Sequence, residues 1–277
     1  MVRIKFRSKE ACERRRLFIK RIIVVLIILI ILITVGTVLF LRMERIQIRE
    51  TNIEGTNIID KEEVNNIVNT SLSGNYLWLI PKSNTFLYSL KDLNNNLIKK
   101  FPGIYSLNIN REGFKKISIE IEERKPQALW CKDGNEEIPE CYFVDSTGKV
   151  FASAPYFSGN VYFIYKGELS KEDPLGAQIF IPEDFSLFQI FIKQIKSKLE
   201  LSIVGVELKN QGDFDLLLSS GTKIMLNKKN SYEDMYNNID TILKSQQLSS
   251  SNLDSIDYID MRFGNKVYYK AKSAPKF

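Results

Sequence analysis

The hydrophobic pattern of the chain begins with twenty consecutive uncharged residues, mostly Ile, Leu and Val, from Ile22 to Leu41. With a helical rise of about 1.5 Å per residue, a helix of this length spans roughly 30 Å, the thickness of the hydrocarbon core of a bilayer. A buried helix of a soluble protein would carry a polar stripe, whereas no polar side chain occurs before Thr34. The run is also longer than the core of a cleaved signal peptide and ends without a small-residue cleavage site. We therefore predict one retained transmembrane helix over residues 22–41.

A different pattern follows, in which short alternating segments and helical segments predict a first domain over residues 46–124. Residues 46–50 alternate like a strand. Asp60 and Glu63 have the spacing of a capping box and predict the start of a helix that ends near Gly74. A second helix and two alternating strands are expected at 86–101, 105–110 and 117–122. The predicted order of elements is β-α-α-β-β.

Residues 125–271 are predicted to form a second, mainly antiparallel β domain with two helices. One helix is expected at about 184–199, where large apolar residues make a single face, and another begins at Ser231, whose side chain can cap it. The expected strands, separated by turn residues, lie at 143–145, 148–151, 161–165, 204–208, 214–218, 223–226, 256–263 and 266–270. Residues 272–277 would form a short C-terminal tail. The whole chain is assigned to the α+β class.

The positive charge of the chain is concentrated at its N-terminus. Overall there are 39 Lys and Arg against 33 Asp and Glu, a net charge of +6. Residues 1–21 hold nine basic and two acidic side chains, a net +7, which leaves −1 for all the others. This balance removes the electrostatic basis for nucleic-acid binding by the main body. By the positive-inside rule, the basic tail 1–21 is expected in the cytoplasm and the chain after residue 41 outside it.

The chain contains no His. This excludes Ser-His-Asp and Cys-His catalysis and zinc sites that use His. The carboxylates offer no better catalytic pair, because Glu120 and Glu122 alternate with Ile on a predicted strand and should face water. Neither a glycine-rich phosphate loop nor a Gly-x-Ser-x-Gly turn occurs. We therefore expect a binding protein and no enzyme, without a cofactor, a metal or a small-molecule substrate.

Two of the three cysteines fall on the external side of the predicted membrane helix. Cys131 and Cys141 flank a turn-rich acidic stretch between two strand-like segments, and pairing of those strands would bring the thiols together. Cys12 lies in the cytoplasmic tail, where thiols stay reduced. The pattern favours a disulfide between Cys131 and Cys141. The alternative is two free thiols in a small core.

The order of these features resembles the bacterial cell-division family FtsQ/DivIB over nearly the full chain. Ile53-Glu54-Gly55-Thr56-Asn57 is similar to the family's opening strand, and Phe101-Pro102-Gly103-Ile104 to the segment before a later strand. The domain junction, a hairpin of the β domain and the last two strands have similar counterparts at 119–126, 143–151 and 259–269. The resemblance implies that the domain at 46–124 is of the POTRA type. The acidic stretch between the cysteines departs from the family pattern.

This resemblance implies a non-catalytic scaffold of the division machinery, the divisome, in the inner or plasma membrane at the division septum. The expected partners are coiled-coil membrane proteins of the FtsB/DivIC and FtsL type, other divisome membrane proteins and, through them, the septal peptidoglycan synthesis complex. The implied mode of binding is addition of a partner strand to the C-terminal edge strand. The expected partner-binding residues are Arg262, Phe263, Lys266, Val267, Tyr268 and Tyr269. The aromatic residues would act as anchors, or alternatively would cover the local core.

A second function stays open beside the division scaffold: a POTRA-bearing component of secretion or envelope assembly. Such proteins usually carry several POTRA copies or lead into a membrane barrel, whereas this sequence predicts a single copy and a helical anchor. Depletion of the protein separates the two, because cell filamentation indicates a division role and loss of an envelope or secreted protein indicates the alternative.

Overall fold

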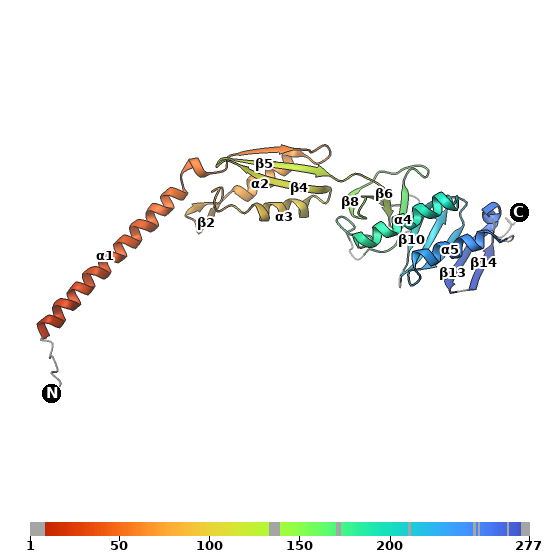
Figure 1. The fold of residues 1–277 in the computed structure, drawn as a ribbon. Helices are drawn as coiled ribbons and strands as arrows, with labels where there is room; N and C mark the ends of the chain where they lie inside the picture. The colour runs from red at the N-terminus through yellow and green to blue at the C-terminus, as the bar shows by residue number, and fades with distance from the viewer. Residues whose placement is uncertain are drawn as a thin grey trace, which may run out of the picture. The chain divides into compact units, whose positions relative to one another are not determined.

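The computed structural model describes residues 9–132, 139–169, 173–209, 212–245, 248, 250–264 and 266–272. The chain forms two compact units (Figure 1), one made of Met1–Phe101 with Ser106–Glu123 and the other of Pro102–Tyr105 with Arg124–Phe277. Parts of the predicted cytoplasmic tail, acidic stretch and C-terminal tail, at 1–8, 133–138 and 273–277, lie outside the described residues. The elements confirm a mixed α+β chain with one N-terminal apolar helix and a large β-sheet.

The N-terminal helix α1 spans Lys9–Leu41, so it begins before the predicted membrane span and ends with it. Its segment Arg14–Leu41, 28 residues, is long and apolar enough to cross a membrane. The two threonines in the apolar run donate their hydroxyl groups to carbonyls of the same helix, at 2.8 Å for both Thr34 and Thr37. These hydroxyl groups are thereby satisfied without water, as the hydrocarbon core of a bilayer requires.

The rest of the first unit is built on a three-stranded sheet with its helices on one side (Figure 1). The strands are β1 (Glu50–Glu54), β4 (Ile104–Glu112) and β5 (Lys116–Glu123). They are ordered β1-β5-β4, and β1 runs parallel to β5. The alternation of β5 places Ile117, Ile119 and Ile121 in the core.

Two helices cover this sheet, each started by a capping side chain. In α2 (Lys61–Leu72), Asp60 accepts a hydrogen bond from the N–H of the first turn, and in α3 (Leu90–Lys100), Ser89 does the same. Between the helices lies a short ribbon of two antiparallel strands, β2 (Asn75–Tyr76) and β3 (Ile80–Pro81). The helices bury their apolar stripes completely or almost so, at Val64, Val68, Leu93 and Leu97.

The segment between α1 and β1 differs from its prediction. Residues 46–50 alternate like a strand, but the structure has a short 3-10 helix η1 (Glu44–Ile46) followed by irregular chain. Ile48 is buried as the alternation indicates, yet its N–H donates to the carbonyl of Ser83 in a loop, over 2.8 Å. A loop offers no continuous ladder, so no strand forms. Phe86, predicted on the second helix, lies before its cap and is exposed.

The second unit, here called the β domain, contains a nine-stranded sheet in the order β14-β13-β12-β11-β10-β9-β6-β7-β8. The strands nearest the first unit in sequence are β6 (Ala128–Cys131), β7 (Cys141–Val144), β8 (Val150–Ser153) and β9 (Phe163–Lys166). The others are β10 (Ile203–Leu208), β11 (Asp213–Leu218), β12 (Lys223–Asn227), β13 (Ile256–Phe263) and β14 (Lys266–Ala271). A 3-10 helix, η3 (Ser250–Ser255), precedes β13.

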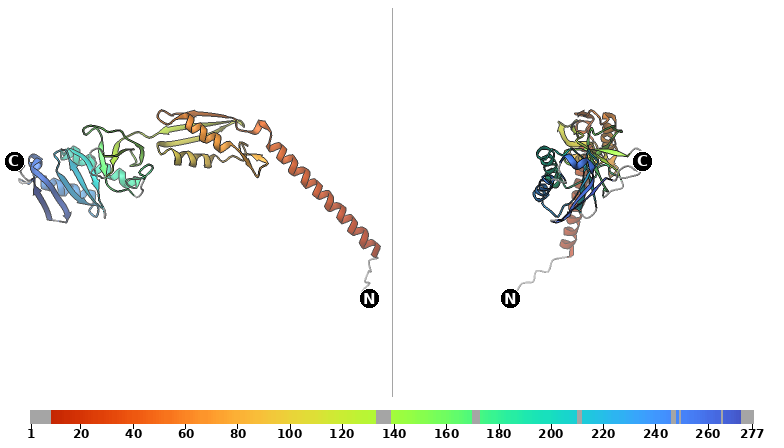
Figure 2. Two further views of the ribbon diagram at one scale, coloured as in Figure 1. Left: turned by 180° about the vertical axis from the view of Figure 1, so that it is seen from behind. Right: turned by 90° about the vertical axis from the view of Figure 1, so that its right-hand side faces the viewer.

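Five of the eight described strand pairs in this sheet are antiparallel, in line with the predicted mainly antiparallel domain, but three are parallel, which the sequence did not predict. β9 pairs in parallel with β6 and β10, β12 pairs in parallel with β13, and the hairpins pair antiparallel. Two of the parallel pairs follow from the placement of the two helices, α4 (Pro182–Lys198) and α5 (Tyr232–Leu243). Each connects two neighbouring parallel strands, β9 to β10 and β12 to β13, and a parallel pair needs such a crossover. Both helices lie on the same face of the sheet (Figures 1 and 2).

The core of the β domain lies between these helices and the sheet. Helix α4 contributes Phe185, Phe188 and Phe191, all at most 1% exposed, and the rings of Phe188 and Phe214 of β11 are 5.4 Å apart. Trp130 is also buried, and its indole N–H donates to the carbonyl of Gly167 over 3.1 Å. These aromatic contacts join β6, β9, β11 and α4 into one hydrophobic cluster.

A buried ion pair fixes the start of the β domain. The Arg124 guanidinium pairs with the carboxylate of Asp145, and its Nε donates to the carbonyl of Pro102 over 3.0 Å. The same carboxylate accepts hydrogen bonds from the N–H groups of Thr147 and Lys149, at 2.8 and 3.0 Å. Asp145 therefore organises the turn between β7 and β8 as well as the entry of the chain into the domain.

Candidate partner-binding edge

Strand β14 forms one outer edge of the nine-stranded sheet (Figure 1). All of its residues, Lys266–Ala271, are exposed. It pairs antiparallel with β13, and Tyr269 lies opposite Ile259 while Tyr268 lies opposite Asp260. Because one side of a strand's backbone pairs inward, the other side presents N–H and C=O groups at the open edge. A partner strand could pair with these groups.

The side chains of the predicted site are divided between the two faces of this edge. Ile259 belongs to the buried core, so Tyr269 opposite it, and Val267 two residues away, stand on the helix-covered face. Tyr268 stands on the other face with Asp260. The three side chains remain 37–52% exposed. They do not complete the core, and a strand added at the edge would contact side chains on both faces.

A bulge at the end of β13 brings Phe263 into this surface. The register shifts between Asp260 and Phe263, and Phe263 then pairs with Lys266 across the turn. The rings of Phe263 and Tyr268 meet edge to face, with centroids 5.6 Å apart. Phe263 is exposed although it lies on a strand. The structure thus brings Phe263, Lys266 and Tyr268 together at the tip of the hairpin.

Arg262 is held by carboxylates of its own domain. Its guanidinium makes ion pairs with Asp260 at 2.6 Å and with Asp213 of β11 at 2.8 Å. The hydrogen bonds from Arg262 lower the pKa of the Asp260 carboxyl below its ordinary value, although partial burial opposes this. The guanidinium lies 5.7 Å from the centre of the Phe263 ring. Arg262 therefore positions Phe263 and keeps the bulge in place, a role that sequence reasoning did not assign.

The two carboxylates that hold Arg262 were missed by the sequence analysis. Asp260 lies two residues before Arg262 on the same strand face, and this spacing could have indicated a pair. Asp213 is 49 residues away along the chain. It reaches Arg262 only because β11, β12 and β13 are neighbours in the sheet, which no local pattern indicates.

The predicted cysteine pair lies elsewhere in the β domain. The structure joins Cys131 at the end of β6 to Cys141 at the start of β7 by a disulfide, and the two residues are opposite each other in the strand register. The bond spans two neighbouring strands far from β14 in the strand order. It belongs to the framework of the domain and does not form part of the candidate edge.

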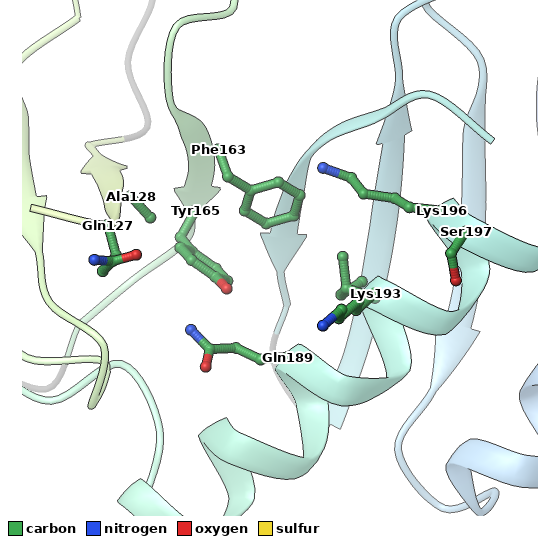
Figure 3. A pocket seen from close by; sticks show the side chains of 9 residues that line it. Gln127, Ala128, Phe163, Tyr165, Gln189, Lys193, Lys196 and Ser197 are labelled. Atoms are coloured by element: carbon green, nitrogen blue, oxygen red, sulfur yellow. The ribbon is translucent and has the colours of Figure 1, made fainter. Parts of the chain in front are cut away.

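A groove of 440 Å³ between α4 and strands β6 and β9 is another candidate site (Figure 3). Its lining includes Phe163, Tyr165, Gln189, Lys193 and Lys196. The Lys196 ammonium lies 4.8 Å from the centre of the Phe163 ring, and partial burial lowers the pKa of this lysine. The described lining carries no carboxylate or thiol, and among the described residues no three His, Cys, Asp or Glu come together as a metal site. The described lining therefore offers neither a pair of carboxylates nor a cluster of metal ligands.

Residues 128–262 match the family model described as cell division protein FtsQ/DivIB, C-terminal. The match starts at β6 and ends at the bulge of β13, so it leaves out residues 102–105 and 124–127 of the β domain and all residues after Arg262, including β14. This confirms the resemblance to the FtsQ/DivIB family. A comparison with curated proteins gives no significant match.

Proposed function

Because the chain carries the C-terminal domain of the FtsQ/DivIB family, whose members are non-catalytic cell-division proteins, we propose that it is a non-catalytic scaffold of the divisome. The family and the single N-terminal apolar helix fit a bitopic membrane protein with a role in cell division. In the proposal, residues 1–21 lie in the cytoplasm, both folded units lie outside it, and the protein works at the division septum. The POTRA-like domain would dock membrane-proximal partners.

The proposed partner of the β domain is a coiled-coil membrane protein of the FtsB/DivIC type, together with its FtsL-type companion. We infer that a segment of this partner adds a strand to the open edge of β14. The observation that supports this is a six-residue edge strand whose residues are all exposed, including Tyr268 and Tyr269. Main-chain hydrogen bonds would give affinity, and the aromatic side chains on both faces would give specificity.

Co-purification of the full-length chain with the coiled-coil septal proteins tests this proposal. Tyr269→Asp should weaken capture roughly tenfold or more, because a charge replaces an aromatic anchor at the contact. Tyr156→Asp is the matched control, since Tyr156 is an exposed tyrosine of the same domain that follows β8, the strand at the opposite edge of the sheet. Equal capture by both variants would contradict the proposed contact.

Two proline substitutions test the backbone pairing itself. Successive N–H groups of a strand point to opposite sides, so one of Val267 and Tyr268 donates outward and the other toward β13. Val267→Pro and Tyr268→Pro should therefore differ: the outward-facing position loses partner capture with little loss of stability, and the inward-facing position loses both. If both prolines leave capture and septation intact, strand addition at β14 is wrong.

A further inference from the structure

Several large apolar side chains are exposed at one end of the first unit. The tip of the β2–β3 ribbon carries Leu77 and Trp78, which are 89% and 90% exposed. Their neighbour Leu79 is exposed too. Three more exposed apolar residues lie in two other loops, Phe86 and Leu87 before α3 and Phe114 between β4 and β5. These six residues, Leu77, Trp78, Leu79, Phe86, Leu87 and Phe114, are called the apolar rim below.

The loops of the apolar rim are bound to the chain segment that leaves the membrane helix. The Asn84 side chain donates to the carbonyl of Leu41, the last residue of α1, over 2.8 Å. One residue further on, the N–H of Thr85 donates to the carbonyl of Ile46 over 2.9 Å. Phe86 follows directly, so its loop is fixed at the end of the apolar run.

The other two loops are anchored in the same place. The N–H of Arg49 donates to the carbonyl of Lys115, the residue after Phe114, over 2.8 Å, and the rings of Phe86 and Phe114 are 5.7 Å apart. Strand β3 contacts α1 directly, and the described side chains of α1 are exposed except at Val38 and Leu41, in its last turn. Trp78 is only two residues from β3. The three loops of the apolar rim thus lie near the point where α1 ends.

The backbone at the tip is held in an unusual conformation. Leu77 and Trp78 have φ angles of +47° and +62°, in the left-handed region that bulky residues rarely adopt. Burial of these side chains does not offset the energetic cost of the strained backbone, since both side chains are almost fully exposed. Strain that packing does not explain points to a functional constraint, here the outward presentation of two large apolar side chains.

The residue types around this end match a membrane–water interface. Trp and Tyr are enriched where lipid headgroups meet the hydrocarbon core, and Tyr76 and Trp78 are at the tip. Basic side chains in the same segments, at Arg42, Arg45, Lys82 and Lys115, could contact lipid phosphates. From these observations we propose that the apolar rim inserts into the outer interface of the bilayer around the end of α1, with Trp78 as its main anchor.

Tryptophan fluorescence of the full-length chain in vesicles tests this inference. The chain has two tryptophans, and Trp130 is 4% exposed inside the β domain, so the emission lost in Trp78→Ser reports on Trp78. The vesicles contain phosphatidylcholine and phosphatidylglycerol with bromine atoms near the carboxyl end of the acyl chains, in both leaflets. Because bromine quenches on contact, most of the Trp78 emission should be lost in these vesicles and kept in unbrominated ones.

A matched control places an exposed tryptophan at the other end of the same unit. Ile58 is 82% exposed, and its N–H is bound by the Glu123 carboxylate at the far end of β5, over 2.9 Å. Arg49 is bound to Lys115, just before the other end of β5, and the eight residue steps from Lys115 to Glu123 correspond to roughly 26 Å. Ile58→Trp in the Trp78→Ser background should keep its emission in the brominated vesicles.

The outcomes are distinct. Quenching of Trp78 without quenching at position 58 supports insertion of the apolar rim. Unquenched Trp78 overturns it, and so does equal quenching at both positions, since the whole domain would then lie on the bilayer. Protection of Trp78 from an aqueous quencher only after a divisome protein is added also overturns it, because the rim would then be a protein contact. None of these results depends on capture of a partner by β14.

Discussion

The outer strands β8 and β14 belong to the same sheet, but their outer backbone groups have different partners. At β8, the N–H of Val150 donates to the carbonyl of Ala177 and its carbonyl accepts from Gly176, over 3.0 and 2.8 Å. Lys149 forms an isolated bridge with Gln178. The side chains of Val150 and Phe151 are both buried. The chain therefore covers the start of the β8 edge, at Lys149 and Val150, with its own residues 176–178.

At β14, no described residue pairs with the outer side of the strand, and its side chains are exposed. A covered edge cannot accept another strand, whereas an open one can, and open edges carry a risk of unwanted pairing that proteins usually limit. The lysines Lys266 and Lys270 at the two ends of the strand provide such a limit. Under the proposed function, the β8 edge serves stability and the β14 edge serves binding, which predicts different results for mutations at the two edges.

The largest expected effect on stability comes from the turn beside the covered edge. Asp145 is 2% exposed, pairs with the 11% exposed side chain of Arg124 and accepts the N–H groups of the β7–β8 turn. Asp145→Ala leaves a buried guanidinium without its partner, and should lower the unfolding free energy by about 3–5 kcal/mol. Denaturant unfolding of the protein measures this directly.

The matched substitution beside the open edge is Asp257→Ala. Asp257 pairs with Lys270 of β14 at 3.3 Å, but both side chains are about half exposed or more. Solvent screens such a pair, so its loss should change the unfolding free energy by less than about 1 kcal/mol. If Asp257→Ala destabilises the domain as much as Asp145→Ala, the division between a stability edge and a binding edge is wrong.

The disulfide tests the same division between a stability edge and a binding edge. Its expected effect on the unfolding free energy lies between those of Asp145→Ala and Asp257→Ala. It joins β6 to β7, next to the covered strand β8, and closes a loop of ten residues. Reduction should cost about 2–3 kcal/mol, since a cross-link of this loop length restricts the unfolded chain to that extent. A reductant should therefore lower the melting temperature of the wild type and leave that of a Cys131→Ala/Cys141→Ala variant unchanged. Equal melting of the wild type with and without reductant would favour the alternative of two free thiols.

The open edge could be predicted from sequence, whereas the covered one could not. Alternating residues after Gly264 indicate a final hairpin, and a strand at the end of such a hairpin is free on one side unless another segment reaches it. The cover of β8 comes from residues near Gly176, a turn with no periodic pattern, and 26 residues separate it from Val150. Its position depends on the tertiary packing of the loop.

The same limit explains the parallel pairs and the Arg262 site. The helices and strands follow from local periodicity, so α4 and α5 are found close to their predicted ranges. Which strands lie side by side depends on how each helix crosses the sheet, and this brings Asp213 to Arg262. The family resemblance therefore implies Phe263 and Tyr269 as contact residues, but the carboxylates that position the bulge emerge only from the strand order.

Acid should weaken the covered edge through Asp145, with a smaller effect than removal of its side chain. Burial by itself would raise the pKa of this carboxyl, but hydrogen bonds from Lys149, Thr147 and Arg124 outweigh it and hold the pKa below the ordinary value of 3.8. Since the folded-state pKa is the lower one, this contribution to stability is present above pH 3.8 and is lost as the pH falls through the folded-state value. The unfolding free energy should be measured at about pH 6 and about pH 3 for the wild type and for Asp145→Asn. Between these two conditions the wild type should lose more than Asp145→Asn, because the amide does not titrate. Equal losses would mean that the negative charge on Asp145 does not stabilise the β8 edge. The hydrogen bonds of the β7–β8 turn alone would then account for the difference in stability between the β8 and β14 edges.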